Sequence, residues 1–275
     1  MLIANTIISA IGMILLPLVA GYFIAKKFKL SFKGFRKLFV AGALTFITSQ
    51  VLHIPFLYGL TAMFKNGMLP SPPESWTLIF NAILLGLLAG IFEETARYIL
   101  FKYILKNSHT WKDSIMVGLG HGGIEAIFIG ILAILTFAQM MAMRNVTDFS
   151  SLGIPANQIE AVKTQVNIYW AQSDVMPFFG FMERISAICL HIGLSVLVMY
   201  SIVNGQRKWF WFALLWHAFV DAIAVYLYPK ITAGTHVLLG TFGLESLVAV
   251  FGVGLLIYAI RLRGSFPVEK ETVNI

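Results

Sequence analysis

Ionisable side chains interrupt a segment that is otherwise as apolar as a membrane span. Residues 91–101 read IFEETARYILF, which places Glu93, Glu94 and Arg97 within about one helical turn of one another. Side chains three or four residues apart are neighbours on a helix, so Arg97 can pair with either glutamate. A charged group in the bilayer core costs about 2.5–3.5 kcal/mol on insertion scales, so groups of this kind are expected to have a function.

Three later apolar segments carry polar groups at helical spacing. They read GLGHGGIEAI, ERISAICLH and LLWHAFVDA, and they supply His121, Glu125, His191, His217 and Asp221. At about 1.5 Å of rise per residue, these groups and Glu93 lie roughly 12–18 Å from the same end of their helices. The shared depth predicts that they meet in one site.

Imidazoles and carboxylates in one dry site are typical of hydrolysis by either of two mechanisms. In the first, Glu93 takes a proton from water, and histidines stabilise the oxyanion at the attacked carbonyl. In the second, zinc binds some of these side chains and activates the water. The zinc ligands would then come from Glu93, His121, Glu125, His191 and His217. The His-Glu-x-x-His motif of many zinc proteases is absent, so we favour the mechanism without a cofactor and keep zinc as the alternative.

Membrane-spanning helices must position these residues. The chain has 275 residues, of which 58% are hydrophobic and 12% charged, and this composition excludes an ordinary soluble domain. A span needs about 20 apolar residues, and seven segments qualify: 3–25, 38–60, 77–101, 113–140, 176–203, 209–228 and 237–260. We predict an all-α, multi-pass protein of the cell membrane, namely a bacterial plasma membrane. Residues 1–275 form one transmembrane domain, with the catalytic core helices over 77–228.

The basic residues predict the orientation of the spans. Fourteen Lys and Arg lie at one end of the expected helices and four at the other. The positive-inside rule then places the N-terminus outside and the C-terminus in the cytoplasm. The long 141–175 connection would be extracytoplasmic, and its apolar residues at helical spacing after Pro155 predict a short amphipathic helix on the outer surface. The net charge of +7 reflects this topology, and no basic soluble face for nucleic acid is visible.

The four motifs, in this order, resemble those of the YhfC family of intramembrane peptidases. That family is similar to the PrsW proteases and to the CAAX prenyl proteases of the ABI (CPBP) type, which are glutamic-type intramembrane proteases. The resemblance covers about residues 77–228. It implies hydrolysis of peptide bonds in membrane-protein or lipidated-peptide substrates.

The resemblance also implies roles for the residues of the first and last motifs. Glu93 would be the water-activating base, and Glu94 and Arg97 would support it. His217 and Asp221 would form the oxyanion or transition-state site.

The two middle motifs carry the departures from the related families. Glu125 takes the position where CAAX proteases have a histidine and PrsW proteases a glutamate, and His191 matches the third motif of the PrsW type. His121 stands where those relatives have phenylalanine, which makes a metal site more plausible here than in CAAX proteases. The expected catalytic set is Glu93, Glu94, Arg97, His121, Glu125, His191, His217 and Asp221.

Two readings of another class remain open: a proton-coupled transporter and a catalytically inactive membrane scaffold. Buried acids and histidines also relay protons. Seven spans do not divide into equal inverted halves, however, and the polar groups gather near one end instead of lining a path across. We interpret Glu183, Arg184 and Glu245, nearer the other end, as structural.

Hydrolysis needs water at the buried groups. Since these groups lie in the half of the helices nearer the basic end, the cytoplasm is the nearest source of water. We therefore expect a cleft that opens to the cytoplasm and cleavage in the cytoplasmic half of a substrate span.

Overall fold

The fold is a bundle of long helices. The structure, a computed structural model, describes residues 1–266. Its long helices are α1 (Leu2–Lys27), α2 (Phe32–Lys65), α3 (Thr77–Ile99), α4 (Trp111–Met143), α6 (Met176–Val203), α7 (Lys208–Thr232) and α8 (Val237–Arg261). Within the described residues these seven are long and apolar enough to cross a membrane. The predicted all-α polytopic membrane fold is confirmed.

Short helical pieces join the spans. They are η1 (Glu74–Trp76), a π-helical turn η2 (Leu100–Ile104), η3 (Phe149–Leu152), η4 (Ala156–Gln158), α5 (Ile159–Ala171) and η5 (Leu262–Ser265). Helix α5 is the helix predicted after Pro155. It packs Val166 against Met143 and Phe149, and Trp170 donates to the carbonyl of Met140 at 3.2 Å, so this segment is anchored to the end of α4. Its position on an outer membrane surface stays a prediction.

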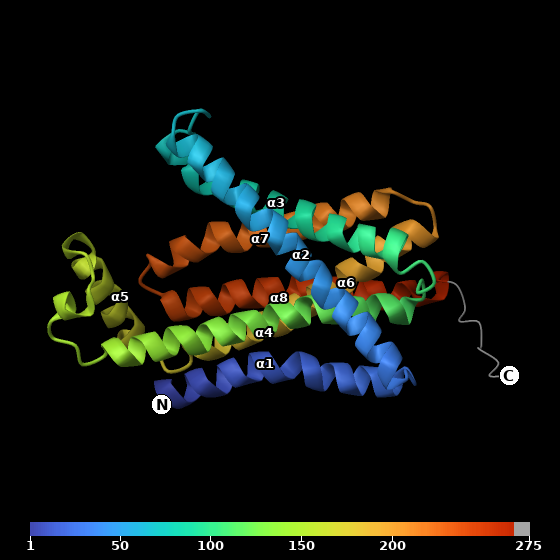
Figure 1. The fold of residues 1–275 in the computed structure, drawn as a ribbon, viewed down its shortest axis with the longest axis horizontal. Coiled ribbons are helices and arrows are strands. Elements are labelled where there is room, and N and C mark those ends of the chain that lie inside the picture. Colours follow the sequence, from blue (N-terminus) through green and yellow to red (C-terminus); the bar gives the residue numbers. More distant parts are fainter. Residues whose placement is uncertain (267–275) are drawn as a thin grey trace.

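The long helices run along the longest axis of the molecule, and α2 crosses the bundle diagonally (Figure 1). The N-terminus and α5 lie at one end, which we call the α5 end. The connections 28–31, 105–110 and 204–207 lie at the opposite end, which we call the basic end because most of the Lys and Arg are there. The last of the basic residues counted above, Lys270, falls outside the described residues. Which end faces the cytoplasm stays a prediction from charge.

Small residues let the helices approach closely where the polar motifs meet. A Cβ added at Gly86 of α3 would lie 2.3 Å from the carbonyl oxygen of Ala218 in α7. A Cβ at Gly118 of α4 would lie 2.6 Å from Cα of Ile192 in α6. These positions admit only glycine, so the neighbouring helices pack directly against them. They bring the acidic motif of α3 against α7 and the histidine motif of α4 against α6.

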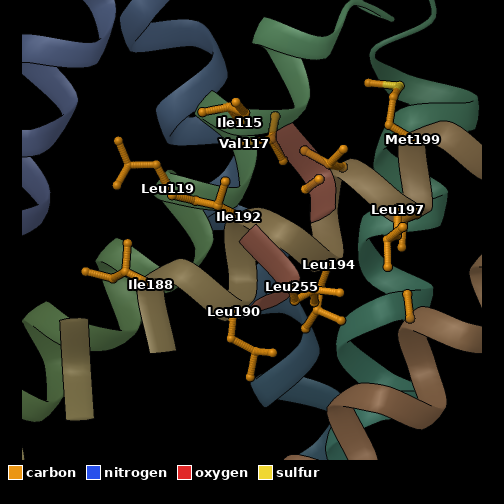
Figure 2. Packing of buried hydrophobic residues seen from close by; sticks show 14 of the residues in the cluster. Ile115, Val117, Leu119, Ile188, Leu190, Ile192, Leu194, Leu197, Met199 and Leu255 are labelled. Atoms are coloured by element: carbon orange, nitrogen blue, oxygen red, sulfur yellow. The ribbon is translucent and has the colours of Figure 1, made fainter. Parts of the chain in front are cut away.

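The apolar core fills the basic half of the bundle. Figure 2 shows Ile115, Val117 and Leu119 packed with Ile192, Leu194 and other residues of the same cluster. Several of its large side chains are completely buried, namely Phe101, Met116, Leu119, Leu194, Leu197 and Met199. Each lies between the polar residues of its own helix and the basic end. The basic half of the bundle is therefore tightly packed.

Candidate active site

The site is built around the carboxylate of Glu93, which is 5% exposed. Its Oε2 lies 2.9 Å from Nε2 of His121 in α4 and 3.8 Å from Nε2 of His217 in α7. Its Oε1 accepts a hydrogen bond from Nε2 of Gln50 in α2 at 3.0 Å. Three helices thus contribute groups around one carboxylate of α3.

Glu94 and Arg97 form a completely buried ion pair one turn apart. The same oxygen of Glu94, Oε1, lies 2.8 Å from Nδ1 of His217. Since an ionised carboxylate only accepts, Nδ1 of His217 carries the proton and its Nε2 is left facing Glu93. This pair therefore fixes the tautomer of His217 and the orientation of its ring.

His191 is held in a similar way from α4 and α3. Its Nε2 lies 2.6 Å from Oε2 of Glu125, and its Nδ1 lies 2.7 Å from NH2 of Arg97. A guanidinium group can only donate, so Nδ1 accepts and Nε2 donates to the carboxylate. Arg184 completes the chain, because its NH1 donates to the other oxygen of Glu125 at 2.6 Å.

Asp221 lies one turn after His217, and its Oδ2 is 3.5 Å from Nε2 of that histidine. Its side chain is 36% exposed, in contrast to the buried residues around it. All eight residues of the predicted set are therefore joined by direct contacts, and the shared depth inferred from helix rise is a real juxtaposition.

A cavity of about 700 Å³ leads from this cluster to the α5 end. Glu93, Glu125, His191, His217 and Asp221 line its inner part. Its outer part is lined by the first turns of α1, α6 and α8, by the later turns of α4 and α7, and by Tyr169 and Gln172 of the α5 segment. The site is thus open to the α5 end.

This direction corrects the expected cleft toward the basic end. The depth of a residue along its helix does not reveal which end of the bundle is packed. Here the apolar core closes the shorter path from the polar cluster to the basic end, and the longer path to the α5 end stays open. The expected cleavage in the cytoplasmic half of a substrate span, which assumed the shorter path, therefore loses its support.

Residues 12–240 match the family described as YhfC intramembrane metalloprotease. A relative named "Uncharacterized membrane protein YhfC", from Bacillus subtilis (strain 168), is 33% identical over 209 residues, which cover 74% of this chain and 77% of that protein. The chain belongs to the YhfC family. No solved structure matches this YhfC-family chain significantly. The similarity to PrsW and CAAX proteases stays a prediction.

The family description supports a peptidase and differs from the mechanism without metal that the sequence favoured. In this YhfC-family chain, donor atoms of Glu93, His191 and His217 lie within 4.8 Å of one another. These are three of the five zinc ligands considered from sequence. His121 and Glu125 contact the trio instead, each through one of its members.

The donor types fit a divalent cation, and one donor nitrogen, Nδ1 of His191, is engaged by Arg97. Each histidine of the trio gives one ring nitrogen to a carboxylate, His217 to Glu94 and His191 to Glu125. Metal-ligating histidines commonly have such a carboxylate partner. The cluster also has more carboxylates than guanidinium groups, and Oε2 of Glu94 is buried with no hydrogen-bond partner among residues 1–266. Buried charges are usually paired or coordinate a metal, so a cation suits this site.

Two contributions were missing from the sequence-based site. Gln50 and Thr45 of α2 lie outside the four motifs, and a search for ionisable groups does not find them. Arg184 had been interpreted as structural with Glu183 and Glu245, yet it pairs with Glu125 as well as with Glu183. The sequence held one signal for α2: the small residues Gly42, Thr45 and Ser49 recur at helical spacing. In the structure all three are buried and mark the face turned to the other helices.

Proposed function

We propose that this chain is an intramembrane peptidase whose centre is a divalent metal, zinc by donor type, held by Glu93, His191 and His217. The supporting observation is the grouping of these three donors in a cavity, with each histidine oriented by its own carboxylate. Zinc takes His nitrogen and Glu oxygen in catalytic sites and keeps one position for water. A bound zinc would supply a water nucleophile at neutral pH.

The protein's own groups would do the remaining work. Glu94 and Glu125 each accept a ring proton and thereby hold the histidines in the required tautomer. Asp221 lines the cavity beside His217 and is the most exposed carboxylate of the centre, so it can take a proton from the attacking water and return it to the leaving amine. His121 would hold Glu93 in place.

A metal-free mechanism is the second candidate, and one contact favours it. The nitrogen of His191 that does not face Glu125 lies 2.7 Å from Arg97. A metal ligated by this nitrogen would have to displace the guanidinium group. Without metal, Glu93 would be the general base and the histidines would stabilise the oxyanion.

The substrate would be an extended peptide segment of a membrane-associated protein. The lining of α7 runs from His217 to Tyr228, which is roughly 16 Å at 1.5 Å per residue. At about 3.3 Å per extended residue this length holds about five residues. With the N-terminus outside, as the positive-inside rule predicts, these residues would enter from the extracytoplasmic side.

The test compares membrane-protein fragments from cells that carry the wild type with fragments from cells that carry His217→Ala, by mass spectrometry of new termini. We expect termini that disappear in the variant. Identical sets of termini at equal protein levels would contradict a peptidase function.

The same purified protein separates the two mechanisms. About one zinc per chain, with activity lost on chelation and restored by zinc, supports the metal centre. Full activity in metal-free protein would instead establish the metal-free candidate.

A further inference from the structure

Helix α2 contacts the carboxylate of Glu93 although it carries none of the four motifs. Nε2 of Gln50 donates to Oε1 of Glu93 at 3.0 Å. Gln50 also lies outside residues 77–228, where the catalytic core was expected. A side-chain amide cannot act as an acid or base at neutral pH, so its contribution must be geometric.

A second contact from α2 reaches the other oxygen through His121. The hydroxyl of Thr45 lies 2.6 Å from the carbonyl oxygen of Gly42 and 2.7 Å from Nδ1 of His121. An ionised carboxylate only accepts, so Nε2 of His121 donates to Oε2 of Glu93 at 2.9 Å. Nδ1 of the same ring then accepts the single proton of the Thr45 hydroxyl.

We propose that Gln50 is a positioning residue for Glu93, with Thr45 supporting it through His121. The inference rests on the proposed metal centre. Because Gln50 occupies Oε1, the carboxylate cannot turn freely about its terminal bond, and Oε2 stays directed toward Nε2 of His217, 3.8 Å away. Glu93 would thus present a single oxygen to the metal.

The effect of losing this contact on metal binding can be judged from other metal sites, where residues hydrogen-bonded to the ligands have been removed. Removing a group that orients a ligand typically reduces metal affinity or activity 10–100-fold. Gln50 is partly buried against Glu93, so little water is available to replace its amide. We expect zinc affinity to fall by about the same factor.

The test is Gln50→Met in detergent-purified protein, with zinc affinity measured by competition against a chelator. Methionine keeps the length of the side chain and removes the donor. The matched control is Thr48→Val on the same helix, because the Thr48 hydroxyl bonds only to backbone carbonyls of α2. We expect 10–100-fold weaker zinc binding in Gln50→Met and unchanged binding in Thr48→Val. Wild-type affinity in Gln50→Met would overturn the proposal.

A second measurement keeps this inference distinct from the metal centre. The thermal unfolding midpoint of metal-free protein is compared for Gln50→Met, Glu93→Met and the double variant. If Gln50 holds Glu93, the double variant shifts the midpoint by less than the two single shifts combined, because contacting residues are not additive. Additive shifts would overturn the role of Gln50. If the wild type binds no zinc, the metal centre fails, and this comparison alone decides whether Gln50 holds Glu93.

Discussion

NH1 of Arg184 lies 2.6 Å from Oε1 of Glu125, while the other oxygen of that carboxylate faces His191 at 2.6 Å. The arginine therefore contributes to the site through Glu125, although it comes from a position that looked purely structural. It also pairs with Glu183, so one guanidinium group holds two carboxylates at the wall of the cavity.

Arg184→Met is expected to remove the arginine partner of Glu125, which leaves His191 to hold this largely buried carboxylate. Breaking a buried ion pair by removing one partner typically costs about 3–5 kcal/mol, and these side chains are 10% and 20% exposed. Thermal unfolding in detergent should show a loss of this order, and activity should fall because Glu125, which orients His191, is held less firmly.

The control for Arg184→Met is Lys163→Gln. It breaks an ion pair with Glu160 whose side chains are 40% and 85% exposed. Pairs of this kind contribute about 0–1 kcal/mol, so stability should hardly change. Equal losses in the two variants would show that the pair of Arg184 and Glu125 is no more important than a surface pair.

Glu93→Gln should abolish hydrolysis while the protein stays folded and inserted in the membrane. The amide cannot accept a proton from water and is a poor zinc ligand, so both candidate mechanisms lose a required group. A loss of at least about 10²–10⁴-fold is expected, measured as release of a new terminus from a substrate identified by comparison with His217→Ala. Near-normal turnover would show that Glu93 is not part of the catalytic centre.

Much of this site is predictable from sequence because the cost of buried charge is so high. Glu93, His121, His191 and His217 stand out in apolar spans, and helix rise alone gives their common depth. Gln50 is neutral, and burying its side chain costs less free energy than burying a charge. A glutamine in an apolar span therefore does not stand out in the sequence. The direction of the cavity depends on how Leu194 and its neighbours pack across several helices, and a periodic pattern along one helix does not contain that information.

Removal of metal tests the proposed centre directly. Treatment with a strong chelator should lower activity by orders of magnitude, and zinc should restore it.

His121→Ala tests which residues bind the metal directly. His121 contacts Glu93 but is not one of the three proposed ligands. The variant should therefore retain zinc with about 10–100-fold lower affinity. Complete loss of zinc in His121→Ala would instead make His121 a ligand, as the wider set considered from sequence allows.

The direction of the cavity predicts which side of the membrane supplies water and substrate. Cys189 is the single cysteine of the chain, so Cys189→Ala gives a background for labelling. Ala224→Cys lines the cavity on α7, whereas Leu197→Cys lies in the completely buried core. A membrane-impermeant thiol reagent added outside intact cells should modify Ala224→Cys and leave Leu197→Cys unmodified.

Lys163→Cys on α5 reports the topology separately. Modification of Lys163→Cys from outside, with Ala224→Cys reached only from the cytoplasm, would contradict the cavity direction. If both were reached only from the cytoplasm, the cavity direction would hold and the orientation predicted from charge would be inverted.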